Sequence, residues 1–116
     1  MSKVEPIHEN RFAGEVIESS IPVVVDFYAT WCPPCKVLAP VLDRLAGEFA
    51  GRVKFVKVNV DEDPGLAAEH GIRGVPTLML FRDGSARETI VGLIPPQSLV
   101  AKLDSLTAGV ATPAAT

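Results

Sequence analysis

The order of apolar and polar positions predicts alternating helices and strands along the chain. In residues 7–18, apolar side chains recur at helical spacing and predict a short amphipathic helix that buries Phe12, Val16 and Ile17. Residues 21–29, "IPVVVDFYA", form an apolar run rich in β-branched side chains, with no polar alternation. Such a run is typical of a strand that is covered on both faces, so we expect the first strand inside a sheet.

A longer helix is predicted to begin at Pro34. Its apolar positions follow the i, i+3, i+4, i+7 rhythm of one buried stripe, formed by Leu38, Val41, Leu42, Leu45 and Phe49. Pro40 lies inside this helix and should kink it, because proline removes one hydrogen bond to the preceding turn. Gly51 is expected to end the helix, and residues 53–61, "VKFVKVNVD", are predicted to form the second strand.

The second half of the sequence predicts a short helix, a hairpin and a closing helix. Asp63 is expected to cap the short helix, with Pro64 at its first position and Gly71 at its end. The segments "TLMLF" and "ETIVGL" are predicted strands. They are joined by "RDGS" at 82–85, where Asp-Gly between apolar runs favours a tight hairpin turn. The last helix begins near Pro95 and carries an apolar stripe of Leu99, Val100, Leu103 and Leu106.

This order of elements predicts one domain at residues 1–107. Strands separated by helices are expected to be parallel neighbours, and the hairpin adds an antiparallel edge. The predicted fold class is therefore α/β, with a mixed central β-sheet flanked by helices on both faces. Residues 108–116, "AGVATPAAT", are small and lack periodicity, so we expect this tail to be disordered.

Composition and charge argue against several classes of function. The chain has 116 residues, is 47% apolar and carries a net charge of −3, so no basic field indicates binding to nucleic acid. No apolar stretch approaches the roughly 20 residues that a membrane helix requires. The N-terminus lacks the apolar core of a signal peptide. We therefore expect a soluble, monomeric protein of the cytoplasm, without nucleic-acid or membrane partners.

Both cysteines of the chain lie within "WCPPC", separated by two prolines. In a reducing compartment such a close pair indicates redox chemistry or metal binding rather than a structural crosslink. Zinc is the weaker interpretation, because two cysteines supply half of a tetrahedral site and no second cysteine pair or nearby histidine pair completes it. His8 and His70 are far from the cysteines in the sequence, and we assign them no role.

Cys32 and Cys35 occupy positions i and i+3 where a strand gives way to a helix, so their sulfur atoms can meet. The free N–H groups and the positive dipole end of the helix favour an anion. We therefore expect Cys32 to be an exposed thiolate with a lowered pKa, and Cys35 to lie behind it. Pro33 and Pro34 have fixed φ angles and no N–H. We expect them to hold the loop rigid, so that closing the disulfide orders less chain.

Asp26 is the ionisable residue of the first predicted strand. A buried carboxyl group tends to be protonated, with a raised pKa, and Asp26 could then accept the proton of Cys35. The alternative is an aspartate at the edge of a strand, facing water. Lys57, on the next predicted strand, either approaches Asp26 and moderates its charge or is an ordinary exposed lysine.

The motifs taken together resemble the thioredoxin family. "WCPPC" follows an apolar strand, and "GVPT", "FRDG" and "VG" come after it in the family's order over residues 5–107. The resemblance implies the thioredoxin fold and favours Asp26 as a buried proton acceptor. The chain departs from the family at Pro33, where thioredoxins usually carry glycine. Because this dipeptide tunes the reduction potential across the family, the departure affects the potential rather than the dithiol chemistry.

The resemblance also implies a surface for substrates around the cysteines. The bond between Val75 and Pro76 is expected to be cis, in a loop that faces the thiols and leaves its backbone free to pair with an extended substrate. Gly92 is expected to interrupt the strand "ETIVGL" where another backbone approaches closely. Trp31 and Gly74 are expected to belong to the same surface.

The activity implied by the resemblance is reduction of protein disulfides. Cys32 attacks a disulfide of a client protein, and Cys35 then releases the reduced client. The expected partners are disulfide-containing clients and an NADPH-dependent thioredoxin reductase, and no bound cofactor is expected because the thiols carry the electrons. Two alternatives stay open: a more oxidising family member that makes or reshuffles disulfides, and a redox-independent subunit that binds through Trp31, Pro76 and Gly92.

Overall fold

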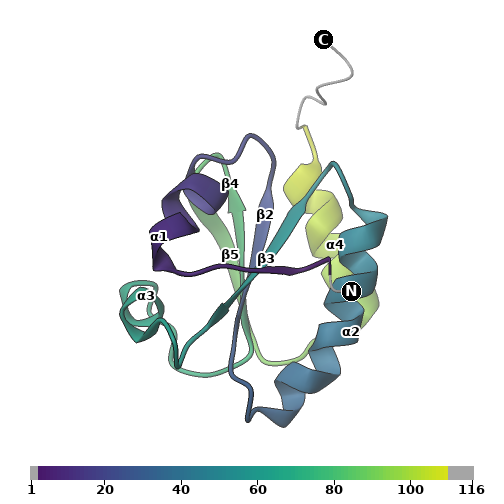
Figure 1. The fold of residues 1–116 in the computed structure, drawn as a ribbon. Coiled ribbons are helices and arrows are strands. Elements are labelled where there is room, and N and C mark those ends of the chain that lie inside the picture. Colours follow the sequence, from purple (N-terminus) through teal and green to yellow (C-terminus); the bar gives the residue numbers. More distant parts are fainter. Residues whose placement is uncertain (1–2, 110–116) are drawn as a thin grey trace.

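The computed structural model describes residues 3–109 and places helices on both faces of a central sheet (Figure 1). The sheet has five strands in the order β1-β3-β2-β4-β5, which confirms the predicted α/β class with a mixed sheet. In chain order the elements are β1 (Glu5–Pro6), α1 (Glu9–Phe12), η1 (Ala13–Ile17), β2 (Val23–Tyr28), α2 (Pro33–Glu48), β3 (Lys54–Asn59), α3 (Pro64–Glu69), β4 (Thr77–Arg82), β5 (Ser85–Val91) and α4 (Pro96–Thr107).

The strands of the sheet run in both directions. β3 is parallel to β1 and to β2, while β4 is antiparallel to β2 and to β5. The expectation that strands separated by a helix are parallel neighbours is therefore confirmed for β2 and β3 and wrong for β4. α3 has six residues and is about 9 Å long, whereas a six-residue strand spans about 20 Å. The short helix does not return the chain along the sheet, so β4 starts at the edge where β2 ends.

Separate sets of helices cover the two faces of the sheet (Figure 1). α2 and α4 bury their apolar stripes on one face, in a cluster that includes Leu42, Leu45, Leu99 and Leu103. α1, η1 and α3 cover the other face, in a cluster that includes Phe12, Val16 and Leu66. β2 contributes Val24 to the first cluster and Val25 to the second. This strand is therefore covered on both sides, as its uniformly apolar sequence predicts.

The first predicted helix is shorter and less regular than its pattern indicates. α1 forms one turn, and the following residues form the π-helical turn η1. A π-helical turn holds more residues than an α-helical turn, so the side chains after Ala13 are rotated away from the predicted stripe. Val16 is buried as expected, but Ile17 is 40% exposed. β1, with two residues, has no counterpart in the sequence pattern.

α2 closely follows its predicted course. It begins one residue earlier, at Pro33, and continues through Pro40; the kink expected at that residue stays a prediction. Four positions of the predicted stripe are buried and Val41 is half-buried at its edge; the buried ones are Leu38, Leu42, Leu45 and Phe49.

Asp63 occupies the N-cap position of α3, but its carboxylate does not cap that helix. It accepts a hydrogen bond from the backbone N–H of Glu9 at 3.2 Å, at the start of α1. Its second oxygen lies 2.9 Å from Nδ1 of His8. The expected N-cap position of Asp63, with Pro64 at the first helical position, is confirmed, but its side chain caps the start of α1, which is distant in sequence, and not α3. His8, to which the sequence assigns no role, is part of this link.

The hairpin and the end of the chain complete the fold. Asp83 and Gly84 both have positive φ angles, of 54° and 77°, as a type I′ turn requires. The guanidinium of Arg82 donates a hydrogen bond to the carbonyl oxygen of Ala108 at 2.8 Å and so ties the end of α4 to β4. Residues 110–116 lie outside the described residues, and the disorder expected there stays a prediction. Between residues 3 and 109, no helix is both long and apolar enough to cross a bilayer.

Candidate active site

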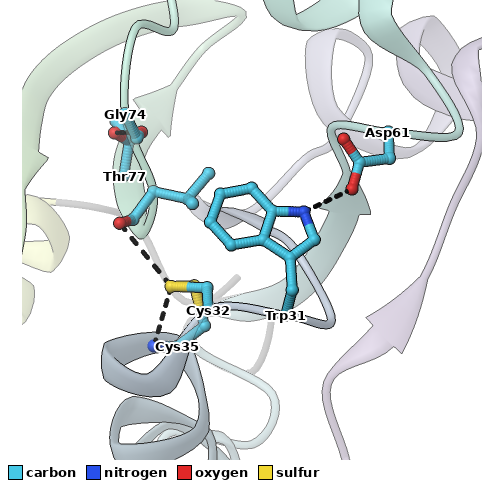
Figure 2. The surroundings of a disulfide bond; sticks show 7 residues. Trp31, Cys32, Cys35, Asp61, Gly74 and Thr77 are labelled. Atoms are coloured by element: carbon cyan, nitrogen blue, oxygen red, sulfur yellow. Dashed lines mark hydrogen bonds between the residues drawn. A yellow bond between two sulfur atoms is a disulfide. The ribbon is translucent and has the colours of Figure 1, made fainter.

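A disulfide bond joins Cys32 and Cys35 at the start of α2 (Figure 2). The two Cα atoms are 5.3 Å apart, a separation that one helical turn supplies. The sulfur atoms meet as their spacing predicts. The bond lies at the edge of the sheet where β2 ends, a place where loops from several elements come together.

Cys32 is the N-cap residue of α2. Its Sγ accepts a hydrogen bond from the backbone N–H of Cys35 at 3.2 Å. Pro33 and Pro34, the first two helical residues, have no N–H. The amide of Cys35 is therefore the first donor of the helix, and it points at the sulfur where the helix dipole favours negative charge.

The side chain of Cys32 is buried in the disulfide form. Cys32 is 2% exposed and Cys35 is 5% exposed, so the expectation of an exposed first sulfur is wrong for this form. Both cysteines pack with Ala29, and half-buried Val75 lies against this small cluster. The Sγ of Cys32 is 3.6 Å from the carbonyl oxygen of Val75. The loop that carries Val75, distant in sequence, covers the sulfur and is the loop that, by the resemblance, is expected to face the thiols.

The loop before β4 lies beside the disulfide (Figure 2). The bond between Val75 and Pro76 is cis, as the resemblance implies. The hydroxyl of Thr77 donates a hydrogen bond to the carbonyl oxygen of Gly74 at 2.7 Å and closes the loop. Among the described residues, the amide N–H of Val75 has no hydrogen-bond partner. This loop therefore presents a free backbone donor next to the sulfur of Cys32.

Gly92 follows β5 rather than interrupting it, since the strand ends at Val91. Its φ angle is +83°, a conformation that favours glycine. Its N–H donates to the carbonyl oxygen of Pro76 at 2.9 Å. A Cβ at Gly92 would meet no atom within 4 Å, so the expectation that a close backbone approach requires this glycine is wrong, and the positive φ angle is what favours it.

Asp26 is buried in β2, with 5% exposure, between the neighbouring strands β3 and β4. The alternative of an aspartate at a strand edge facing water is therefore wrong. Burial raises the pKa of Asp26 to about 7, and the nearby ammonium of Lys57 opposes part of this shift. Asp26 and Lys57 lie opposite each other in the register of β2 and β3. Among the described residues, Oδ1 of Asp26 has no hydrogen-bond partner.

Asp26 and Cys35 line the same cavity, which has a volume of about 240 Å³. The remaining lining residues are Tyr28, Ala29, Thr30, Lys36, Ala39 and Lys57. A cavity of this size with polar groups on its wall has room for water molecules. Water there would lie between the carboxyl group of Asp26 and the sulfur of Cys35.

Trp31 is 65% exposed, beside the buried cysteines. Its indole Nε1 donates a hydrogen bond to Oδ2 of Asp61 at 2.7 Å, which fixes the exposed ring next to the disulfide (Figure 2). Asp61 is a residue of the site that the sequence analysis does not identify. The signal was available, because Trp31 and Asp61 follow the carboxyl ends of the parallel neighbours β2 and β3, which meet at one edge of the sheet.

The comparisons with known proteins agree with this geometry. The thioredoxin family model matches residues 3–105. Thioredoxin 1 of Synechococcus elongatus is 49% identical over 104 residues, which cover 90% of this chain and 97% of that protein. The chloroplastic M-type thioredoxin of Chlamydomonas reinhardtii is 48% identical, covering 81% of this chain and 67% of its own length. Thioredoxin of Rickettsia felis is 46% identical, and the match covers 81% of this chain and 90% of that protein. Together with the paired cysteines, these matches show that the chain belongs to the thioredoxin family and is a thiol–disulfide oxidoreductase that reduces protein disulfides.

Proposed function

We propose that Cys32 is the nucleophile, Cys35 the resolving thiol and Asp26 the proton acceptor of this reductase. The observation that carries the assignment is the cavity shared by Asp26 and Cys35; Cys32 does not line this cavity, and its Sγ lies next to the carbonyl oxygen of Val75 instead. A carboxyl group with a pKa of about 7 can bind and release a proton near neutral pH, where thiol–disulfide exchange takes place. The N-cap position of Cys32 favours its thiolate, the form that attacks disulfides.

The reaction transfers two electrons from the protein to the client. The thiolate of Cys32 attacks one sulfur of the client disulfide, whose S–S bond breaks, and the first client thiolate leaves. Cys35 loses its proton to Asp26 through water in the cavity. Its thiolate attacks the Sγ of Cys32, the mixed disulfide breaks, and the second client thiolate leaves. The client thiolates take up protons, and the protein is left with the Cys32–Cys35 disulfide.

Clients would dock as an extended backbone on the loop before β4. The free N–H of Val75 supports this role, because it can donate to a carbonyl group of an added strand. Trp31, Gly74, Pro76 and Gly92 surround this position and would bound the docking surface. Both sulfurs and Asp26 come from one chain, so the reaction can proceed in a monomer.

The oxidised protein must be reduced again after each cycle. By family, a thioredoxin reductase that uses NADPH is the proposed electron donor. The two thiols carry the electrons, so the reaction needs no bound cofactor in this chain. A reducing compartment suits the function because it keeps the dithiol ready, and we propose the cytoplasm.

Replacing each cysteine by serine separates the two proposed thiol roles. Cys32→Ser should abolish reduction of insulin disulfides, because no nucleophile is left. Cys35→Ser should accumulate a covalent mixed disulfide with the client, visible on non-reducing gels and released by dithiothreitol. Ala101→Ser introduces a serine at an exposed position of α4 that does not line the cavity of Asp26 and Cys35, so it serves as a matched control and should turn over like the parent protein. Trapping by Cys32→Ser instead of Cys35→Ser would reverse the assignment.

Pro33 supports a second candidate function, a more oxidising enzyme that makes or reshuffles disulfides. The residue lies between the cysteines, where the family tunes its reduction potential. Equilibration with glutathione buffers separates the candidates. A reductase should lie near the potential of thioredoxin, roughly −270 mV, and an oxidising member near that of protein disulfide isomerase, roughly −180 mV.

A further inference from the structure

Tyr28 lies on the same face of β2 as Asp26, two residues further along the strand. It is half-buried and lines the cavity that Asp26 shares with Cys35. Lys57 lies opposite Asp26 on β3, so Tyr28 is its diagonal neighbour, within reach of a long side chain. The ammonium of Lys57 is 5.3 Å from the centre of the Tyr28 ring, a distance at which a cation and an aromatic face attract each other.

The ammonium of Lys57 therefore contacts the face of the Tyr28 ring, although the carboxyl group of Asp26 lies on the directly opposite residue of β2. Within residues 3–109, Lys57 makes no ion pair with Asp26 or with another carboxylate, and Oδ1 of Asp26 has no hydrogen-bond partner. The phenol of Tyr28 is neutral near pH 7, because an ordinary tyrosine has a pKa of about 10 and burial raises the pKa of Tyr28 further. The neutral ring competes with Asp26 for the cation.

We propose that Tyr28 is a positioning residue whose ring holds the ammonium of Lys57 on the cavity wall and keeps it from forming a direct ion pair with Asp26. A direct pair would favour the carboxylate strongly. Asp26 would then bind no proton near neutral pH. The consequence for catalysis rests on the proposed role of Asp26 as proton acceptor. The placement of Lys57 by Tyr28 does not depend on that role.

Several other charged or titratable groups face this region. The neighbours of Asp26 that line the cavity are Tyr28 on its own strand, Lys57 on β3, and Cys35 and Lys36 on α2. Glu62, after β3, acts on Tyr28 and raises its pKa further. Of these groups, Lys57 is the one whose charge opposes the effect of burial on the pKa of Asp26. A test must therefore show that Tyr28 acts through Lys57 and not through hydration of the cavity.

The test is the titration of the Asp26 carboxyl carbon by ¹³C NMR in the oxidised, full-length protein. Tyr28→Phe keeps the ring and should leave the midpoint of the titration unchanged. Tyr28→Leu removes the ring, so the ammonium can reach the carboxylate, and the midpoint should fall by about one pH unit. If Tyr28→Leu does not fold, Tyr28→Met fills more of the same space and takes its place.

A second pair of variants isolates the contribution of Lys57. The double variant Tyr28→Leu/Lys57→Met should show the same midpoint of the Asp26 titration as the single variant Lys57→Met. An equal fall in both backgrounds would assign the effect to water entering the cavity and overturn the proposal. An unchanged or higher midpoint in Tyr28→Leu alone, or the same fall in Tyr28→Phe, would also overturn it. Because this titration uses the oxidised protein, its outcome is independent of whether Asp26 accepts the proton of Cys35.

Discussion

The backbone N–H of Gly92 donates a hydrogen bond to the carbonyl oxygen of Pro76 at 2.9 Å. This bond continues the pairing of β4 with β5 beyond the end of β5 and ties the turn at Gly92 to the loop beside the disulfide. Gly92 reaches this position with a φ angle of +83°. The placement of the loop that faces Cys32 thus depends on a backbone conformation that residues with a Cβ atom rarely adopt.

Gly92→Ala should lower the free energy of unfolding by about 1–2 kcal/mol, because a left-handed conformation is strained for alanine. A Cβ at Gly92 meets no atom within 4 Å, so the cost comes from the backbone and not from a clash. Gly74→Ala is the matched control. A Cβ there also meets open space, and Gly74 has no positive φ angle. Urea unfolding of both variants checks the prediction, and an equal loss in the two would contradict it.

Asp26→Asn should stabilise the oxidised protein at high pH. The folded-state pKa of about 7 lies above the ordinary value of 3.8, so the native protein binds more protons than the unfolded chain between these values. The free energy of unfolding therefore falls as pH rises through this interval. Asn removes this loss, and the gain at pH 8 should be roughly 2–4 kcal/mol.

Urea unfolding of the Asp26→Asn variant at pH 4 and at pH 8 measures this difference. At pH 4 the carboxyl of Asp26 is protonated in the folded protein, so the two proteins should differ little. A gain of the same size at both pH values would mean that packing, rather than charge, causes it.

Asp61→Ala should lower kcat/KM for client disulfides by about two- to tenfold, the value of one lost hydrogen bond. The indole of Trp31 would no longer be fixed beside the disulfide, because its acceptor at 2.7 Å is gone. Asp61→Asn keeps an acceptor oxygen and is the matched control. Insulin reduction kinetics and Trp31 fluorescence follow the effect, and full activity of Asp61→Ala would argue against a role for ring orientation.

Asp63→Ala should lower the free energy of unfolding by about 1 kcal/mol, because the backbone N–H of Glu9 loses its cap. Asp63→Asn retains an oxygen acceptor and should lose less. The hydrogen bond to Asp63 raises the pKa of His8. The stabilising pair between Asp63 and protonated His8 is therefore fully present below the ordinary pKa of His8, and it is lost as pH rises through the raised pKa that His8 has in the folded protein. The loss caused by Asp63→Ala should accordingly be larger at pH 5 than at pH 9, as measured by thermal unfolding in both buffers.

Long and regular patterns predict most of the fold. The stripe of α2 and the apolar run of β2 extend over many residues, and Asp83-Gly84 leaves few alternatives to a tight turn. The failures are features set by a residue or two, or by distant contacts. β1 is too short to show a period, and the π-helical turn η1 shifts the phase of its helix. The direction of β4 depends on the length of α3. The residues of α3 indicate that this helix is short, but the order of helices and strands alone does not give the direction of β4.

The sequence predicts the reacting groups of the site better than their surroundings. The pairing of Cys32 with Cys35 is local, and the burial of Asp26 follows from the apolar run around it. The burial of Cys32 depends on Val75, which lies 43 residues away. The contact between Lys57 and Tyr28 likewise requires the register of β2 against β3, which one sequence does not specify.

The cysteines belong to a small buried cluster with Ala29, which meets one of the two large clusters through half-buried Val60. The residues that surround the disulfide come from loops at one edge of the sheet, whereas the large clusters are built by the interiors of its helices and strands. Most of the buried core therefore lies outside the loops that we propose as the docking surface for clients. Exchanging these loops for those of a relative should change the proposed docking surface while leaving the two large clusters in place.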